Sequence, residues 1–178
     1  MRIEFGEYVI RDWERKDAAA VARHADNPRV AMWLRNRFPH PYTKGDAAAF
    51  LAAVARQSVR TNFAIATITE AIGGIGLEFG QDVHRFTAEL GYWLGEPFWG
   101  RGIMSGAVSH FTHWAFTHLD LHRIYATVFS GNLASARVLE KAGYRREGCL
   151  RASVFKDGQI RDQWVYAKIR EGIHPTPD

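Results

Sequence analysis

Residues 89–104 constrain the fold of this chain more than any other stretch, and they read ELGYWLGEPFWGRGIM. The apolar and aromatic run at its start predicts a strand, which Gly95 and Pro97 end. The glycines on either side of Arg101 then lead into a helical pattern. A strand that enters a helix through a glycine turn brings backbone N–H groups together at the positive end of the helix dipole. The stretch therefore predicts a binding site for an anion such as a phosphate group.

Length and composition favour one domain that spans residues 1–178, with 170–178 expected to form a frayed tail. The chain has 178 residues, of which 47% are hydrophobic and 24% charged, as in ordinary globular proteins. No apolar run approaches the roughly 18 residues of a membrane span, and an acid, Glu4, stands where a secretory signal would have its apolar run. The one cysteine, Cys149, excludes an internal disulfide and is expected to be half-buried in a strand. We expect a cytoplasmic protein without a membrane partner.

The charge favours a small anionic ligand over nucleic acid. The net charge is 23 − 19 = +4, but Lys and Arg are scattered and form no dense basic run. Four histidines on or after the expected helix could suggest a zinc site. No cysteine or carboxylate pair near them completes one, so we expect no metal. These histidines are His110, His113, His118 and His122.

The hydrophobic pattern predicts alternating strands and helices. Thr43 and Asp46 resemble a capping box before one helix, and Asn132 caps another that Gly143 ends. Two strands joined by the helix 101–118 are expected to run parallel. The segment 30–43 is predicted to be an aromatic and basic loop. Strands are predicted at 8–11, 63–68, 72–79, 86–94, 123–129, 144–155 and 159–169, and helices at 14–25, 43–57, 101–118 and 132–143, the last with Ala134, Val138, Leu139 and Ala142 facing inward.

Three linked motifs closely resemble those of the GNAT N-acetyltransferases. The first two are Glu89–Leu94 and Trp99–Met104, and the third runs from Asn132 to Tyr144 and includes Ser135. Within the family the chain is most similar to the ribosomal-protein alanine N-acetyltransferases, the RimJ/RimL-like branch. The resemblance implies an α/β (α+β) fold, in which a mixed, mostly antiparallel sheet contains one splayed parallel strand pair and carries helices on both faces.

The resemblance also implies acetyl-CoA as co-substrate. The family's pyrophosphate loop falls on Trp99–Met104, where Arg101 either adds a cation or is a solvated residue at the helix start. The strand that ends at Trp93 and Leu94 would pair with the pantetheine arm, and Asn132 would hydrogen-bond that arm. Arg137 or Lys141 could meet the nucleotide phosphates. The implied donor-binding residues are Tyr92, Trp93, Leu94, Trp99, Gly100, Arg101, Gly102, Ile103, Met104, Asn132, Arg137 and Lys141.

Two residues are candidates for proton transfer. Glu89, on the strand that leads to the thioester, would act as general base through water, and the alternative is a structural carboxylate paired with an arginine. Ser135 would protonate the departing thiolate, because related enzymes have an acid at that position. The tyrosine that many family members use falls on Leu139 here, and the base of the alanine N-acetyltransferases falls near Val154.

The predicted activity is acetyl transfer from acetyl-CoA to a primary amine by direct attack in a ternary complex. The leading acceptor is a protein or peptide N-terminal amine, and the segment 33–42 is expected to line its site. The alternatives are a small amine, such as an amino acid, polyamine or antibiotic, and a catalytically weak acyl-CoA-binding module. The sequence leaves open whether the chain forms a homodimer.

Overall fold

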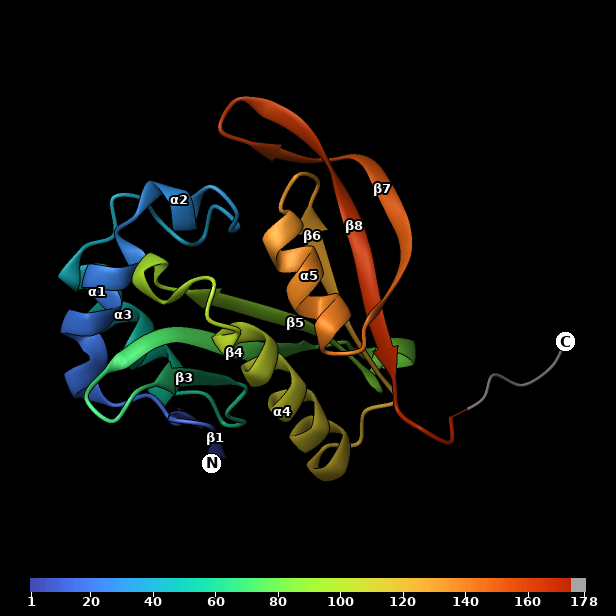
Figure 1. The fold of residues 1–178 in the computed structure, drawn as a ribbon, viewed down its shortest axis with the longest axis horizontal. Helices are drawn as coiled ribbons and strands as arrows, with labels where there is room; N and C mark the ends of the chain where they lie inside the picture. Colours follow the sequence, from blue (N-terminus) through green and yellow to red (C-terminus); the bar gives the residue numbers. More distant parts are fainter. Residues whose placement is uncertain (174–178) are drawn as a thin grey trace, which may run out of the picture.

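The computed structural model describes residues 1–173 and contains an eight-stranded sheet with helices on both faces (Figure 1). The strand order is β1-β2-β3-β4-β5-β6-β8-β7. None of the helices in this part of the chain is long and apolar enough to cross a membrane. The strands are β1 Arg2–Phe5, β2 Tyr8–Arg11, β3 Asn62–Ala66, β4 Ala71–Phe79, β5 Thr87–Leu94, β6 Arg123–Phe129, β7 Arg145–Lys156 and β8 Gln159–Ile169, and the α-helices are α1 Ala18–Ala25, α2 Pro28–Ala31, α3 Lys44–Ala55, α4 Ile103–His118 and α5 Leu133–Lys141.

Helix α4 covers one face of the sheet. Its apolar residues recur at helical spacing, and Phe111 in its middle is fully buried. They pack against strand residues such as Ile65 and Leu90 in the main hydrophobic core. Burying one such side chain stabilises the fold by about 1.5–3 kcal/mol. This interface therefore holds α4 in a fixed position on the sheet.

Helices α1 and α3 cover the opposite face. The predicted capping box opens α3: the Asp46 N–H donates to Thr43 Oγ1 at 3.1 Å, and the Thr43 N–H donates to Asp46 Oδ2 at 2.8 Å. Val21 of α1 packs with Tyr42 in a second core cluster, against which Trp93 of β5 also packs. Alternate residues of β5 therefore face the two different layers.

The β5–β6 pair is parallel, as predicted, and it splays apart. Of the described residues of β5, only 87–89 pair with β6, against 123–125. Beyond that point β5 continues along β4 and β6 continues along β8. The backbone of β5 from Leu90 onward therefore faces a gap on its β6 side, which is where a strand-like ligand could pair.

Several boundaries and burial predictions were wrong. Strand β1 and helix α2 were not predicted, and the first predicted helix begins with a short 3-10 turn at Arg15–Asp17. Leu139 and Ala142 are buried as expected, whereas Ala134 is exposed. Ala134 lies on the side of α5 that lines the cavity at the gap between β5 and β6. Cys149 is exposed because β7 is an edge strand that pairs only with β8 among the described strands. The predicted frayed tail falls partly on 174–178, outside the described residues.

Candidate active site

A continuous cavity of about 1220 Å³ crosses the molecule at the gap between β5 and β6. One end, here called the glycine end, is formed by Gly100, Gly102 and the N-terminal turns of α4 and α5. The other end, here called the aromatic end, is formed on the face that α1 and α3 cover. Its wall consists of Trp13, Phe38, Tyr42, Phe50 and Trp93.

The glycine end is built by a turn that requires its glycines. Gly100 and Gly102 both have φ of 75°, a left-handed conformation that side chains rarely adopt. Gly102 is the N-cap of α4, and the turn before it is held by Trp99, whose Nε1 donates to the Leu94 carbonyl at 2.7 Å. The first N–H groups of α4 have no partner within the helix and carry the positive end of its dipole, which favours an anion.

Most of the predicted donor-binding residues line this cavity. The exception is Arg101, which is not among the cavity-lining residues of the described chain. It is exposed, and its guanidinium carbon lies 5.8 Å from the Phe98 ring centroid. Arg137 and Lys141 do line the cavity, so the cations best placed near a nucleotide come from α5. Trp93 lines the cavity, and its indole packs against Phe38 at the aromatic end.

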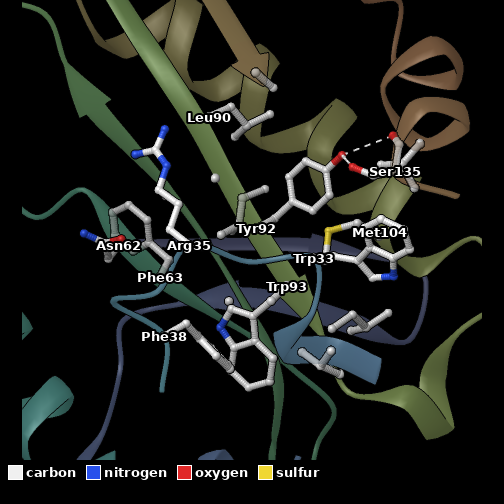
Figure 2. A pocket seen from close by; sticks show the side chains of 18 of the residues that line it. Trp33, Arg35, Phe38, Asn62, Phe63, Leu90, Tyr92, Trp93, Met104 and Ser135 are labelled. Atoms are coloured by element: carbon white, nitrogen blue, oxygen red, sulfur yellow. Dashed lines mark hydrogen bonds between the residues drawn. The ribbon is translucent and has the colours of Figure 1, made fainter. Parts of the chain in front are cut away.

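Ser135 and Tyr92 meet across the gap (Figure 2). The Tyr92 and Ser135 hydroxyl oxygens are 2.7 Å apart, and the Tyr92 hydroxyl also lies 3.2 Å from the Ser135 carbonyl. Asn132 orients this turn, because its Oδ1 accepts from the Ser135 N–H at 3.1 Å. Burial raises the pKa of Tyr92, so its phenol stays protonated near neutral pH. Sequence reasoning did not predict the contact, because the two residues lie 43 positions apart.

Glu89 lines the cavity and is held by two partners. Its Oε1 accepts from Arg35 at 2.5 Å and from the Thr127 hydroxyl at 2.9 Å. Burial alone would lower the pKa of Arg35, but the hydrogen bond and charge of Glu89 outweigh it and raise that pKa above its usual value. The carboxylate therefore has the arginine partner of the structural alternative and, at the same time, the cavity position that a base requires.

The aromatic end draws its side chains from separate segments. Phe38 lies 4.9 Å from the Tyr42 ring and 5.6 Å from the Trp93 ring, between centroids. Trp13 meets Phe50 edge-on at 5.4 Å. Six residues of the segment 33–42, predicted to line the acceptor site, line the cavity, whereas Trp13 and Phe50 were not predicted. Neither carries a local signal that separates a cavity wall from an ordinary core position.

The positions where other family members have their tyrosine and glutamate do not contribute here. Leu139 is fully buried, and among residues 1–173 neither Leu139 nor Val154 lines the cavity. No group of three or more His, Cys, Asp or Glu side chains in the same part of the chain could hold a metal ion. Glu89, Ser135 and Tyr92 line the cavity where β5 separates from β6, and they are the candidates for proton transfer there.

The comparisons with known proteins agree with this architecture. The family model described as acetyltransferase (GNAT) domain matches residues 8–145. The chain belongs to this family, and the predicted fold and RimJ/RimL-like branch are confirmed.

Three similar proteins illustrate the family. The probable N-acetyltransferase YjcK of Bacillus subtilis is 47% identical over 81 residues, which are 46% of this chain and 45% of that protein. The ribosomal-protein-serine acetyltransferase of Escherichia coli is 33% identical over 100 residues, 56% of this chain and 55% of that protein. The matches thus span about half the length of these curated relatives. The structure of Mycobacterium smegmatis RimJ in complex with CoA-disulfide superimposes with a TM-score of 0.82 and 26% identity, over 95% of this chain and 85% of that one.

Replacing Gly102 with valine is expected to weaken acetyl-CoA binding. A valine residue cannot adopt a backbone φ of 75° without strain. This strain costs about 1–3 kcal/mol, and its relief would move the first N–H groups of α4. We expect the KM for acetyl-CoA to rise about 10- to 100-fold. Steady-state kinetics measure this, with Gly172→Val, at a left-handed glycine that does not line the cavity, as the matched control. Equal KM values for the Gly102 variant and the parent chain would contradict the role of the turn.

Proposed function

We propose that this chain transfers the acetyl group of acetyl-CoA to the N-terminal amine of a protein or peptide, by direct attack in a ternary complex. One observation carries the proposal: the cavity passes through the splayed β5–β6 pair and joins the glycine end to the aromatic end. Two substrates entering from opposite ends would meet at the gap, beside Glu89 and Ser135. The thioester supplied by acetyl-CoA is the group that the amine attacks.

Each part of the donor has a partner in the chain. The glycine turn at 99–104 would bind the pyrophosphate through backbone N–H groups, with Arg137 and Lys141 adding positive charge. The unpaired edge of β5 would hydrogen-bond the pantetheine arm. A backbone N–H near Tyr92 would polarise the acetyl carbonyl, as in an oxyanion hole.

The setting of Glu89 favours an N-terminal acceptor. At pH 7 an alkylammonium with a pKa near 10 costs about 4 kcal/mol to deprotonate, whereas an N-terminal amine near 8 costs only about 1–1.5 kcal/mol. Glu89 is hydrogen-bonded to Arg35 and Thr127. A carboxylate held in this way suits the removal of a proton from an N-terminal ammonium group, which costs less free energy than removal from an alkylammonium group. The E. coli relative is named a ribosomal-protein-serine acetyltransferase, which supports a protein as the acceptor. Such an acceptor would place the chain in the cytoplasm.

An assay of CoA release with matched acceptors tests the proposal. We compare two peptides that otherwise share one sequence: one has a free N-terminal amine as its only amine, and the other has a blocked N-terminus and an internal lysine. We expect the first to be acetylated at least about 10-fold faster than the second. Mass spectrometry of the product locates the acetyl group. Turnover of free amino-acid amides and polyamines without turnover of peptides would favour the small-amine alternative. CoA binding without turnover of any amine would favour the acyl-CoA-binding module.

A further inference from the structure

Resting on the proposed function, we propose that the aromatic end is a subsite for a large apolar side chain, of leucine or phenylalanine size, next to the acceptor amine. The acceptor would place its amine at Glu89. Its first side chain would lie against Phe38 and Trp93, which Figure 2 labels. The preference would favour such N-termini over alanine and serine.

The wall of the subsite is apolar and preformed. Trp13, Phe38 and Trp93 are half-buried and pack onto the small core cluster that contains Tyr42. The rings hold one another in edge-on or tilted contacts, with centroids 4.9–5.6 Å apart. Aromatic pairs in this range favour fixed geometry. An apolar side chain that enters therefore loses water without requiring the wall to rearrange.

The floor of the subsite consists of glycines, of which Gly91 is the open one, because the indoles cover Gly74 and the Asn62 side chain covers Gly76. Gly74 and Gly76 of β4 pair with Trp93 and Gly91 of β5, so all four lie on one face. A Cβ at Gly74 would lie 2.8 Å from Trp93 Nε1 and 3.0 Å from Trp13 Cζ2, which shows that both indoles lie directly on the glycine. At Gly91, by contrast, a Cβ would meet no heavy atom of residues 1–173 within 4 Å. The open volume thus begins at Gly91.

The order of residues along β5 sets the pose of the acceptor. Glu89, Gly91 and Trp93 share the cavity face because strand residues alternate. Neighbours on one face are about 7 Å apart, so the carboxylate of Glu89 and the indole of Trp93 flank the open position at Gly91, and a bound residue in that opening can direct its amine toward the first and its side chain toward the second. A methyl or hydroxymethyl side chain would leave the indole uncovered.

Peptides that differ only in their first residue test the preference. We expect kcat/KM for leucine and phenylalanine N-termini to exceed that for alanine and serine by about 10- to 100-fold, the range expected when such a side chain leaves water. Calorimetric binding of the same peptides to the enzyme–CoA complex gives the comparison independently of turnover. Equal or better use of alanine and serine N-termini would overturn the subsite while leaving N-terminal acetylation intact.

Two variants connect the preference to the residues. Phe38→Ala is expected to reduce the leucine-to-alanine ratio about 10-fold. Gly91→Val adds volume where the structure has room and is expected to reduce the same ratio at least as much. Phe155→Ala, on an exposed ring of β7 outside the cavity, is the control and should leave the ratio as it is. An unchanged ratio in both cavity variants would overturn the proposal.

If peptides are not acetylated at all, N-terminal acetylation fails and the subsite is judged on small amines. The pair is 2-phenylethylamine and ethylamine, which differ by one ring. A preference of at least about 10-fold for the larger amine, lost in Phe38→Ala, supports the apolar subsite. Equal use or equal binding of the two overturns it.

Discussion

Changing Glu89 to glutamine is expected to lower kcat/KM for the acceptor by about 100- to 10,000-fold, the usual contribution of a positioned general base. Glutamine keeps the size of the side chain and an oxygen that can accept from Thr127, but it cannot take a proton. The Arg35 guanidinium loses one of its two carboxylate partners at the same time and keeps Glu78. The KM for acetyl-CoA should stay within about two-fold, because Glu89 faces the acceptor side. CoA-release kinetics with a free N-terminal peptide measure both quantities.

Glu78 provides a matched control for that change. It lies directly opposite Glu89 on β4, lines the same cavity and pairs with Arg35 and Arg37. Its side chain is 49% exposed, against 16% for Glu89. We therefore expect Glu78→Gln to change kcat/KM by less than about three-fold. Equal losses in the two variants would assign the effect to the shared arginine, and full activity in Glu89→Gln would remove the proposed base.

Local signals predicted most of the fold. The capping box before α3, the glycine turn before α4 and the strand 123–129 each depend on residues close in sequence, and the structure has all three. Helix α2 was not predicted because a proline such as Pro28 ordinarily interrupts a helical pattern. In the structure Pro28 opens a new short helix, with Asn27 as its N-cap accepting from the Arg29 N–H at 2.8 Å. Strand β1 was not predicted because its four residues gain their order from pairing with β2.

The candidate site also contains features that depend on residues close in sequence and features that depend on residues far apart. The glycine turn and the Asn132–Ser135 cap lie in continuous motifs, so their geometry follows from nearby residues. The partners of Glu89 do not: Arg35 and Thr127 are 54 and 38 positions away. Their contact depends on the register of β5 with β6 and on the path of the loop after α2. A single sequence carries no signal for either, and the same holds for the indoles that cover Gly74.

Ser135→Ala is expected to lower kcat about 100-fold at neutral pH, with little change in either KM. The reason is that the thiolate of CoA, with an ordinary thiol pKa near 8.5, is a poor leaving group at pH 7 unless it is protonated as it departs. Ser135 lies at the gap where the thioester would sit, and the Tyr92 hydroxyl is 2.7 Å from its oxygen. The deficit should shrink above about pH 8.5, where the free thiolate is stable in water. A pH series of kcat for both proteins measures this.

Tyr92→Phe separates the two hydroxyls. Burial raises the pKa of Tyr92, so its phenol is a weak acid that serves best as a hydrogen-bond donor to Ser135. Losing that bond should lower kcat only about 10-fold, and the loss should stay constant with pH, because the serine still provides the proton. Leu139 is buried and provides no hydroxyl at the position where many family members have their tyrosine. Among residues 1–173, Tyr92 is the tyrosine whose hydroxyl lies within hydrogen-bond distance of Ser135. A different result for Tyr92→Phe, in which kcat falls about 100-fold and the loss of kcat becomes smaller at high pH, would make the phenol the proton donor and Ser135 its positioning partner.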